Sequence, residues 1–466
     1  MAVLPPSSLR LLHLLPTYLC LQLHGVTACS PCHCCSPACE SPCCPPEPPG
    51  LSCGSTAPRQ TVTVDPESHP PGRPSIRRLL DLNAGAFNGA WGRQNRLSDV
   101  ADRYRQIGVR RLRTHDYNTA LDIGNIYPDL SVPPSLPSAT NFTLADAAFS
   151  EIVDNGFTPY FRLGNSGGQQ AGSDYHPDNW GSPNTTAQLQ NLVDAMVLIV
   201  GRYSNATRWD LPLAHVEIWN EPNEPGFWQP WPKACRAGPC NSTDNMTAHW
   251  PLFEDLFSQA ARALKANFPQ VKVGGPGLGI SSYCTPDPAT NRSRTGGQGV
   301  NIKPFIQKLV AENVPLDYLS FHRYSNDPHI IAQCGRAIRA MIPAQWELHV
   351  TEWNLDVSGP FNSTAASAIS SATWIGLQDF ADLSTMYWGC CANYPYSASG
   401  LGADGDGLAL FAADAGAPWK PQALAFALWH NFSIGFQNRI DASISGDRLT
   451  PLFGLAGQST SGAVGL

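Results

Sequence analysis

The sequence has few charged residues and no long apolar segment after its first residues. Asp, Glu, Lys and Arg make up only 14% of the 466 residues, and the formal net charge is −7. A sparse and acidic charge distribution provides no basic surface for nucleic acid or for anionic membranes. No later run of about 20 apolar residues is present, so we expect no membrane-spanning helix after the N-terminus.

Residues 1–28 have the pattern of a secretory signal peptide. Arg10 precedes an apolar stretch from Leu11 to Leu23, and Val26-Thr27-Ala28 supplies small residues for cleavage. The apolar stretch is too short to span a bilayer. We therefore expect a secreted, extracellular protein with no membrane association after signal cleavage, or one that reaches a lysosome-like compartment through the secretory route.

Cysteines and glycosylation motifs agree with export. The chain has 15 cysteines, and loss of Cys20 with the signal peptide leaves 14, an even number suited to disulfides in an oxidising compartment. Eight N-x-S/T motifs are acceptors for N-linked glycans and predict a glycoprotein. They begin at Asn141, Asn184, Asn205, Asn241, Asn245, Asn291, Asn362 and Asn431.

Residues 29–75 are expected to form a separate Cys- and Pro-rich linker region. The cysteines from Cys29 to Cys53 lie among Pro, Ser and Gly, without a hydrophobic period that would build a core. A thiolate metal cluster or a small disulfide knot is one interpretation, and a spacer with incidental disulfides is the other. We favour the spacer, because secreted thiols oxidise and no regular pair of C-x₂-C motifs is present.

Between residues 76 and 435, strand patterns alternate with helical patterns. The expected strands are 79–82, 109–113, 158–163, 215–219, 271–273, 317–321, 348–351 and 385–388. The expected helices are 97–107, 144–155, 189–203, 252–268, 305–310, 330–341, 365–380 and 421–432. Eight strands that alternate with helices favour a (β/α)₈ barrel, an α/β fold, over an open sheet.

Polar residues concentrate at the carboxyl ends of these strands, where such barrels place catalytic groups. One strand ends in Trp219-Asn220-Glu221-Pro222, and another is followed by Glu352-Trp353-Asn354. Either glutamate alone is most simply a solvated carboxylate. Glycoside cleavage, however, needs two carboxylates, one to protonate the leaving oxygen and one to attack or to activate water. The pair therefore predicts a glycosidase.

Adjacent residues normally face opposite sides of a strand. Asn220 and Glu221 can both face the site only if their strand ends or bulges there. By the same alternation, His322 and Tyr324 share one face, and Arg323 points the other way.

Three other glutamates were considered as competitors. We interpret Glu224 as a loop residue. Glu217 and Glu347 lie deeper in their strands, so we expect them to be paired in the interior or exposed outward.

The segments Trp219–Glu224 and Thr351–Asn354 resemble the signature segments of clan A glycoside hydrolases. Within that clan the chain most resembles glycoside hydrolase family 39, the family of β-xylosidases and α-L-iduronidases. Residues 156–160, 274–276 and 320–324 are similar to that family's third, fifth and sixth strand segments. The resemblance covers roughly residues 76–435. Members usually carry a β-sandwich, and residues 436–466 would be the start of one that is apparently truncated.

The resemblance implies a retaining double displacement without a metal or another cofactor. Glu221 would be the acid/base, Glu352 the nucleophile, and Asn220 the contact to the sugar's 2-hydroxyl. The other implied substrate-binding residues are His322 and Tyr324, which would orient Glu352, Arg113 and His115 beside the pair, and Trp388 as the floor of the subsite. His115, His322 and His349 do not have the spacing of metal ligands.

The expected partner is an oligosaccharide or polysaccharide of a cell wall or matrix, cleaved at its terminal bonds in a β-xylosidase-like manner. An α-L-iduronidase-like glycosidase and a non-catalytic carbohydrate-binding secreted glycoprotein on the same barrel are the alternatives. The sequence specifies neither the sugar nor the oligomeric state.

The cysteines beyond the linker region leave one pairing open. We expect Cys235 to pair with Cys240. Cys390 and Cys391 either form a vicinal disulfide or join Cys284 and Cys334.

Overall fold

The structure is a computed structural model of the chain. It describes residues 26–27, 60–65, 68, 75–83, 97–114, 119–165, 182–183, 185–223, 227–228, 242–280, 284, 302–356, 359, 363–380, 383–388, 410–411, 419–446, 455–461 and 463–466. The chain divides into two compact units. One is Arg78–His430, and the other combines Met1–Arg77 with Asn431–Leu466.

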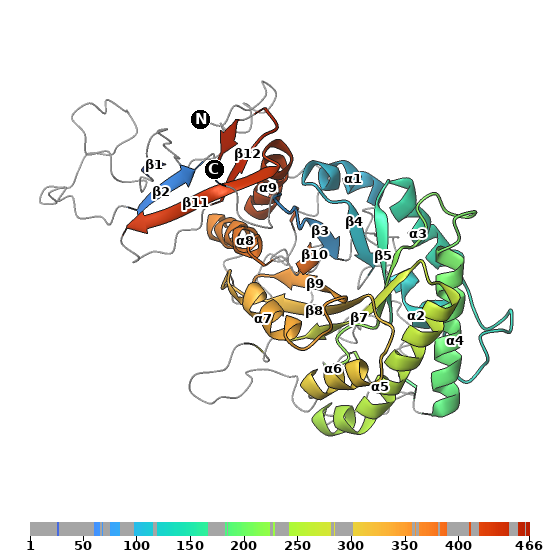
Figure 1. Ribbon diagram of the computed structural model, residues 1–466. Coiled ribbons are helices and arrows are strands. Elements are labelled where there is room, and N and C mark those ends of the chain that lie inside the picture. Colours follow the sequence, from blue (N-terminus) through green and yellow to red (C-terminus); the bar gives the residue numbers. More distant parts are fainter. Residues whose placement is uncertain are drawn as a thin grey trace, which may run out of the picture. The chain divides into compact units, whose positions relative to one another are not determined.

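The unit Arg78–His430 is built on a closed barrel of parallel strands (Figure 1). Its strands are β3 (Asp81–Asn83), β4 (Arg111–Thr114), β5 (Thr158–Leu163), β6 (His215–Ile218), β7 (Lys272–Gly279), β8 (Tyr318–Tyr324), β9 (Glu347–Asn354) and β10 (Leu383–Trp388). The sheet closes because β10 pairs with both β3 and β9. The predicted (β/α)₈ barrel is confirmed.

Helices connect the strands and surround the barrel (Figure 1). They are α1 (Leu97–Gln106), α3 (Thr143–Asp154), α4 (Thr186–Tyr203), α5 (Ser242–Asn267), α6 (Ile302–Ala311), α7 (Ile330–Arg339), α8 (Thr364–Leu377) and α9 (Pro421–Gly435). Two short elements were not expected, the 3₁₀ turn η2 (Thr119–Leu121) and the helix α2 (Ile123–Ile126).

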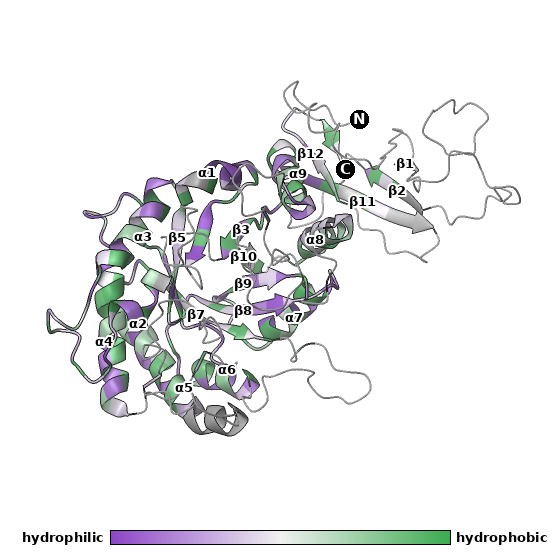
Figure 2. Ribbon diagram, turned by 180° about the vertical axis from the view of Figure 1, so that it is seen from behind, coloured by the Kyte–Doolittle hydropathy of each residue, from purple (hydrophilic) through white to green (hydrophobic). Residues whose placement is uncertain are grey.

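Helix α4 illustrates why these segments are helical. Thr185 caps its start by accepting a hydrogen bond from the backbone N–H of Gln188. The residues that recur at helical spacing in the sequence are buried, and Figure 2 shows both hydrophobic and hydrophilic residues along the helix. These buried residues include Leu189, Leu192, Met196, Ile199 and Tyr203.

The barrel interior is filled in layers, as this fold requires. One layer contains Tyr160, His215, Tyr318 and His349, with the rings of Tyr318 and His349 stacked at 4.1 Å between centroids. The hydroxyl of Tyr160 lies 3.0 Å from Nδ1 of His349. On β6, β8 and β9, the residues two positions further along form the next layer. This layer is polar and leads to the carboxyl end of the barrel.

The second unit contains an antiparallel sheet in the order β1-β2-β11-β12-β13. Its strands are β1 (Val26–Thr27), β2 (Gln60–Asp65), β11 (Asn438–Gly446), β12 (Ala456–Gln458) and β13 (Val464–Gly465). Strand β1 coincides with the expected signal cleavage site. The interpretation of residues 29–75 as a spacer is wrong for β2, because Gln60-Thr-Val-Thr-Val-Asp65 pairs along β11, with Val62 opposite Ile444. The cysteines from Cys29 to Cys53 lie outside the described residues.

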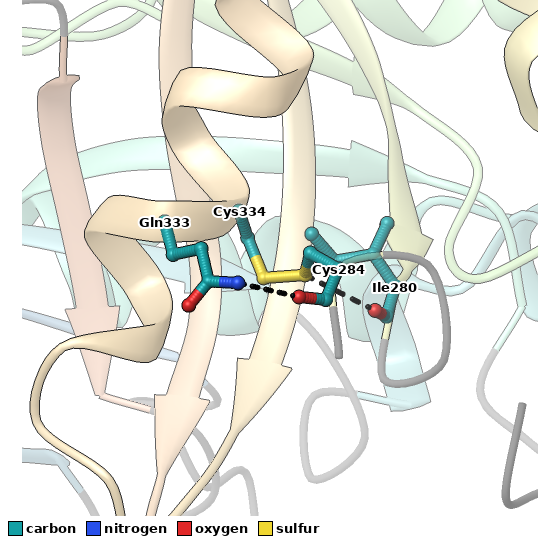
Figure 3. The surroundings of a disulfide bond; sticks show 4 residues. All are labelled: Ile280, Cys284, Gln333 and Cys334. Atoms are coloured by element: carbon teal, nitrogen blue, oxygen red, sulfur yellow. Dashed lines mark hydrogen bonds between the residues drawn. A yellow bond between two sulfur atoms is a disulfide. The ribbon is translucent and has the colours of Figure 1, made fainter. Parts of the chain in front are cut away.

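A disulfide joins Cys284, in the segment after β7, to Cys334 on α7 (Figure 3). The alternative in which Cys390 and Cys391 join these two cysteines is therefore wrong. Cys235, Cys240, Cys390 and Cys391 themselves lie outside the described residues.

None of the described helices is both long and apolar enough to cross a membrane.

Candidate active site

The chain turns sharply where β6 ends at Ile218. Trp219 and Glu221 have φ angles of 75° and 41°, in the left-handed region that side chains rarely adopt. The turn brings the adjacent residues Asn220 and Glu221 to the same site, where Asn220 contacts Arg113 and Glu221 contacts His322. The strand thus ends where the sequence required it to end.

A comparable device places Glu352 at the end of β9. The pairing with β8 steps from Phe321 opposite Val350 to His322 opposite Glu352, which leaves Thr351 in a bulge. A bulge lets adjacent residues face the same side of a sheet. Thr351 and Glu352 consequently both make contacts in the barrel interior.

Both carboxylate oxygens of Glu352 accept hydrogen bonds. Nη1 of Arg113 donates to Oε1 at 2.9 Å, and the hydroxyl of Tyr324 donates to Oε2 at 2.8 Å. The Glu352 side chain is 7% exposed. These two donors fix the plane of the carboxylate, which is what an attacking nucleophile needs.

Glu221 is the more exposed carboxylate, with 17% of its side chain accessible. Nδ1 of His322 lies 2.7 Å from its Oε1, but 3.6 Å from Oε2 of Glu352. His322 therefore bonds to Glu221, and its contact with Glu352, which it was expected to orient, is longer than a hydrogen bond. Alternation along β8 gave the correct face of His322, and the turn at Glu221 determines which carboxylate it meets.

Arg113 is fully buried and connects the site. Its Nε donates to Glu217 at 2.5 Å, Nη1 donates to Asn83 at 2.6 Å and to Glu352, and Nη2 donates to Asn220 at 2.7 Å. Burial alone would lower the pKa of Arg113, but the charges of Glu217 and Glu352 outweigh it and raise the pKa above its ordinary value. The guanidinium therefore remains a fixed positive charge.

Glu217 is the deepest carboxylate of the site. Its Oε1 accepts hydroxyl protons from Ser320 at 2.6 Å and Thr351 at 2.7 Å, and its Oε2 accepts from Arg113. Burial alone would raise the pKa of Glu217, but the charge of Arg113 and the hydrogen bonds from the two hydroxyls lower it below the usual value. Glu217 is therefore an ionised carboxylate paired in the interior, one of the two outcomes expected from its position within the strand.

The glycine-rich end of β7 holds the turn that carries Glu221. The N–H of Glu221 donates to the carbonyl of Gly277 at 3.1 Å, and the Asn223 amide makes two hydrogen bonds with the backbone of Gly279, at 2.7 and 3.0 Å. A Cβ on Gly277 would lie 2.7 Å from Nε2 of His322. This close approach explains the glycine there.

The two candidate catalytic carboxylates lie close together. Glu221, His322 and Glu352 each offer an atom within 4.8 Å of the other two. This close approach favours the arrangement of retaining glycosidases, whose carboxyl groups lie ~5–5.5 Å apart, over that of inverting ones, at ~6.5–9.5 Å. A trio of this kind could also ligate a cation, but the guanidinium of Arg113, 2.9 Å from Glu352, opposes a second positive charge.

The structure brings together six of the predicted site residues, namely Arg113, Asn220, Glu221, His322, Tyr324 and Glu352. His115 and Glu224 lie outside the described residues. Trp388 ends β10, where its backbone pairs with Leu82 and Trp353, and its side chain is not described. Glu347 is half-buried and bonds to Lys272 and His349, away from the catalytic pair.

Sequence reasoning missed four polar residues of the site. Asn83, Ser320, Thr351 and Asn223 were given no role, although each bonds to a site residue or to the β7 backbone. Strand alternation could have predicted the orientation of Ser320, because it precedes His322 by two residues and so shares its face. Thr351 was not, because its orientation depends on the bulge.

Comparisons with known proteins agree with this geometry. Residues 82–341 match the family described as Glycosyl hydrolases family 39. A β-xylosidase from Geobacillus stearothermophilus is 24% identical over an alignment of 296 residues that covers 57% of this chain and 51% of that protein. The match therefore spans about half the length of that relative. The range matched to the family includes Glu221 and His322 and ends before Glu352. The choice of Glu352 as the candidate nucleophile is therefore supported by its geometry and not by this match.

Solved structures show the same barrel. A glucosidase from Croceicoccus marinus has a TM-score of 0.60 at 19% identity, covering 86% of this chain and 74% of that one. A monomeric β-xylosidase from Caulobacter crescentus has a TM-score of 0.55 at 16% identity, covering 86% and 75%. At these identities the likeness demonstrates the fold.

Proposed function

The chain belongs to glycosyl hydrolases family 39, and from this premise we propose that it is a retaining glycosidase with Glu221 as acid/base and Glu352 as nucleophile. The observation that carries the proposal is the pair of carboxylates within 4.8 Å at the carboxyl end of the barrel. One is immobilised by two donors, and the other is bonded to a histidine and is partly exposed. These are the environments that a nucleophile and a proton donor require.

The reaction proceeds in two steps. Glu221 gives its proton to the glycosidic oxygen as the bond between that oxygen and the anomeric carbon breaks, and a carboxylate oxygen of Glu352 bonds to the anomeric carbon. Arg113 and Tyr324 hold Glu352 in line. In the second step Glu221 takes a proton from water, the water oxygen bonds to the anomeric carbon, and the ester to Glu352 breaks. Two inversions give net retention.

Asn220 is assigned to the sugar's 2-hydroxyl. Its Oδ1 accepts from Arg113, which fixes the amide so that Nδ2 remains as the donor. Among the described residues, this buried Nδ2 has no hydrogen-bond partner. A hydroxyl of the substrate would satisfy it, and hydrogen bonds to the 2-hydroxyl strengthen in the transition state of such reactions.

For the substrate, we propose terminal glycosidic bonds of a cell-wall or matrix polysaccharide, cleaved in a β-xylosidase-like manner. The relatives from Geobacillus stearothermophilus and Caulobacter crescentus, both described as β-xylosidases, support this choice. A panel of aryl β-xylosides, α-arabinosides and α-iduronides tests it. Preference for an iduronide would replace the xylosidase assignment, and no turnover of any glycoside would favour a binding protein.

The nucleophile is tested by labelling and by product stereochemistry. A 2-fluoro glycoside should label Glu352, and proton NMR of the first product should show the substrate's anomeric configuration. Glu352→Gln is nearly isosteric and should fold but lose turnover. Label on Glu347, or an inverted product, would refute the assignment.

The acid/base is tested with leaving groups. Glu221→Ala should slow alkyl glycosides far more than dinitrophenyl glycosides, because general acid help is typically worth about 10²–10⁴ in rate where the leaving group is poor. Azide needs no base and should restore turnover as a glycosyl azide. Glu224→Ala is the matched control and should show neither effect, and azide rescue of that variant instead would move the role to Glu224.

We also propose that the chain is exported and N-glycosylated. The supporting features are the N-terminal signal pattern and the exposure of Asn141 and Asn205. In both, Oδ1 accepts a hydrogen bond from the backbone N–H two residues further on. The N–O distances are 3.0 Å from Thr143 and 2.9 Å from Thr207. Mass spectrometry of protein secreted by eukaryotic cells should find glycans on both. Protein that remains in the cells with residues 1–28 still attached would contradict the export.

A further inference from the structure

Thr351 has one hydroxyl proton and two hydrogen-bond neighbours. Its Oγ1 lies 2.7 Å from Oε1 of Glu217 and 3.0 Å from Nε2 of His322. Ionised Glu217 can only accept, so the hydroxyl proton of Thr351 points to Glu217. The hydroxyl oxygen can then only accept from the ring, and Nε2 must carry a proton.

The ionised state of Glu217 is well supported. The carboxylate is fully buried, and it is bonded to the guanidinium of Arg113 and to the hydroxyls of Ser320 and Thr351. All of these groups donate. Its pKa is lowered despite a burial effect that alone would raise it.

We propose that Glu217 and Thr351 fix the tautomer of His322, so that Nε2 carries the only ring proton and Nδ1 presents a lone pair to Glu221. This inference rests on the proposed function, in which Glu221 is the acid/base. Across the 2.7 Å between Nδ1 and Oε1 there must be one proton, and with this tautomer it belongs to Glu221. The resting enzyme then holds its general acid in the protonated form.

The same arrangement favours the second step. Once Glu221 has given its proton to the leaving group, an ionised oxygen faces the lone pair of Nδ1 with no proton between them. Two acceptors at hydrogen-bond distance repel one another. That repulsion is relieved when Glu221 takes a proton from the attacking water. His322 therefore keeps Glu221 protonated before the first step and favours its proton uptake in the second, as a positioning residue that exchanges no proton itself.

The other charged and titratable groups near His322 come from four strands. Glu217 acts through Thr351, Glu221 is in direct contact, and Oε2 of Glu352 lies 3.6 Å from Nδ1. Arg113 lies beside Gly277, the glycine that His322 also borders, since a Cβ on Gly277 would lie 3.4 Å from Nη2 of Arg113. Tyr324 donates to the same Oε2 of Glu352. The ring is 1% exposed. Its burial and the positive charge of Arg113 oppose an imidazolium, whereas the carboxylate of Glu352 favours one, so the protonation state of the ring is the quantity to measure.

The tautomer can be measured without turnover. ¹⁵N-histidine NMR of the full chain, with His322→Gln to assign the signal, should show a ring protonated at Nε2 alone across the pH range of activity. A ring protonated at Nδ1, or at both nitrogens, would overturn the proposal. The result does not depend on any substrate, so it stands apart from the outcome of the glycoside panel.

Thr351→Val gives the kinetic test, because it is nearly isosteric and removes the acceptor of Nε2–H. The ring can then place its proton on Nδ1 and donate to an ionised Glu221. We expect kcat/KM for poor leaving groups to fall about 10- to 100-fold, within the range of general acid catalysis, and for dinitrophenyl glycosides by much less. Thr351→Ser keeps the hydroxyl and should restore both the rate and the pH profile.

Thr373→Val is the matched control. Thr373 is as buried, at 3% exposure, and its hydroxyl donates to the carbonyl of Ile369 on α8, away from the site. It should lose some stability and keep its leaving-group dependence. An equal loss for all leaving groups in Thr351→Val would reduce Thr351 to a structural role and overturn the inference. If Thr351→Val does not fold, the wild-type NMR signal decides.

Discussion

Arg113 and Glu217 form an ion pair in which neither side chain is exposed, with Nε of the guanidinium 2.5 Å from Oε2 of the carboxylate. Buried pairs of this kind contribute little net stability, because both charges lose their hydration. Here the pair has a positional role. Arg113 also bonds to Glu352 and Asn220, so Glu217 orients the guanidinium that holds the candidate nucleophile and the candidate 2-hydroxyl contact.

Glu217→Gln should destabilise the protein by roughly 3–5 kcal/mol, the usual cost of leaving one partner of a buried pair uncompensated. Urea unfolding at pH 7 measures the change. Asp102→Asn is the control, because the Asp102–Arg105 pair is exposed, at 85% and 51%. Exposed pairs contribute less than about 1 kcal/mol. Similar small losses in both variants would contradict a structural role for the buried pair.

Tyr324→Phe should slow formation of the glycosyl-enzyme without unfolding the protein. It removes the donor 2.8 Å from Oε2 of Glu352 and keeps the ring. Hydrogen bonds to charged groups are worth about 1.5–3 kcal/mol, which corresponds to roughly 10- to 150-fold in rate. The rate constant of inactivation by a 2-fluoro glycoside measures this step alone. A rate unchanged from the wild type would show that Arg113 orients Glu352 by itself.

The barrel could be predicted from the sequence because its signals are local. The apolar period of α4 and the short, mostly buried run of β5 each lie within a single segment, and both were predicted with nearly correct bounds. Strand β2 was missed for the opposite reason. Its partner β11 lies at the other end of the chain, and composition drew attention to the neighbouring cysteines.

The meeting of Glu221 and Glu352 at one end of the barrel was also predictable, because the expected strand bounds give the positions of the strand ends. The finer contacts were not. Whether His322 meets Glu221 or Glu352 depends on the left-handed φ of Glu221 and on the bulge at Thr351. Both features arise from tertiary contacts, including the bond from Glu221 to the backbone of Gly277.

The disulfide between Cys284 and Cys334 should stabilise the segment that follows the glycine-rich end of β7. It closes a sequence separation of 50 residues, and Gln333 beside it donates to the carbonyl of Cys284 at 3.0 Å (Figure 3). Replacing both cysteines by serine should lower the free energy of unfolding by about 2–4 kcal/mol. Denaturant unfolding of this double variant beside the wild type measures it, and coincident curves would show that the segment needs no crosslink.

The histidine layer below the site should make the barrel sensitive to acid. Burial, reinforced by the charges of His349 and Arg111, lowers the pKa of His215 to about 3, and burial also lowers the pKa of His349. A histidine whose pKa is depressed on folding is protonated first in the unfolded chain. Its contribution is therefore fully present above the ordinary value of about 6.5 and is lost as the pH falls towards the folded value.

His215→Phe tests this directly. The aromatic ring should keep the stacking on Tyr160, where the centroids are 5.5 Å apart, and it removes the titrating group. Between pH 6.5 and 5, one such histidine changes the free energy of unfolding by up to about 1.4 kcal/mol per pH unit, so the variant should have the shallower slope by about that amount. Urea unfolding at several pH values in this window gives both slopes. Parallel lines for the two proteins would mean that His215 binds its proton as readily in the folded barrel as in the unfolded chain.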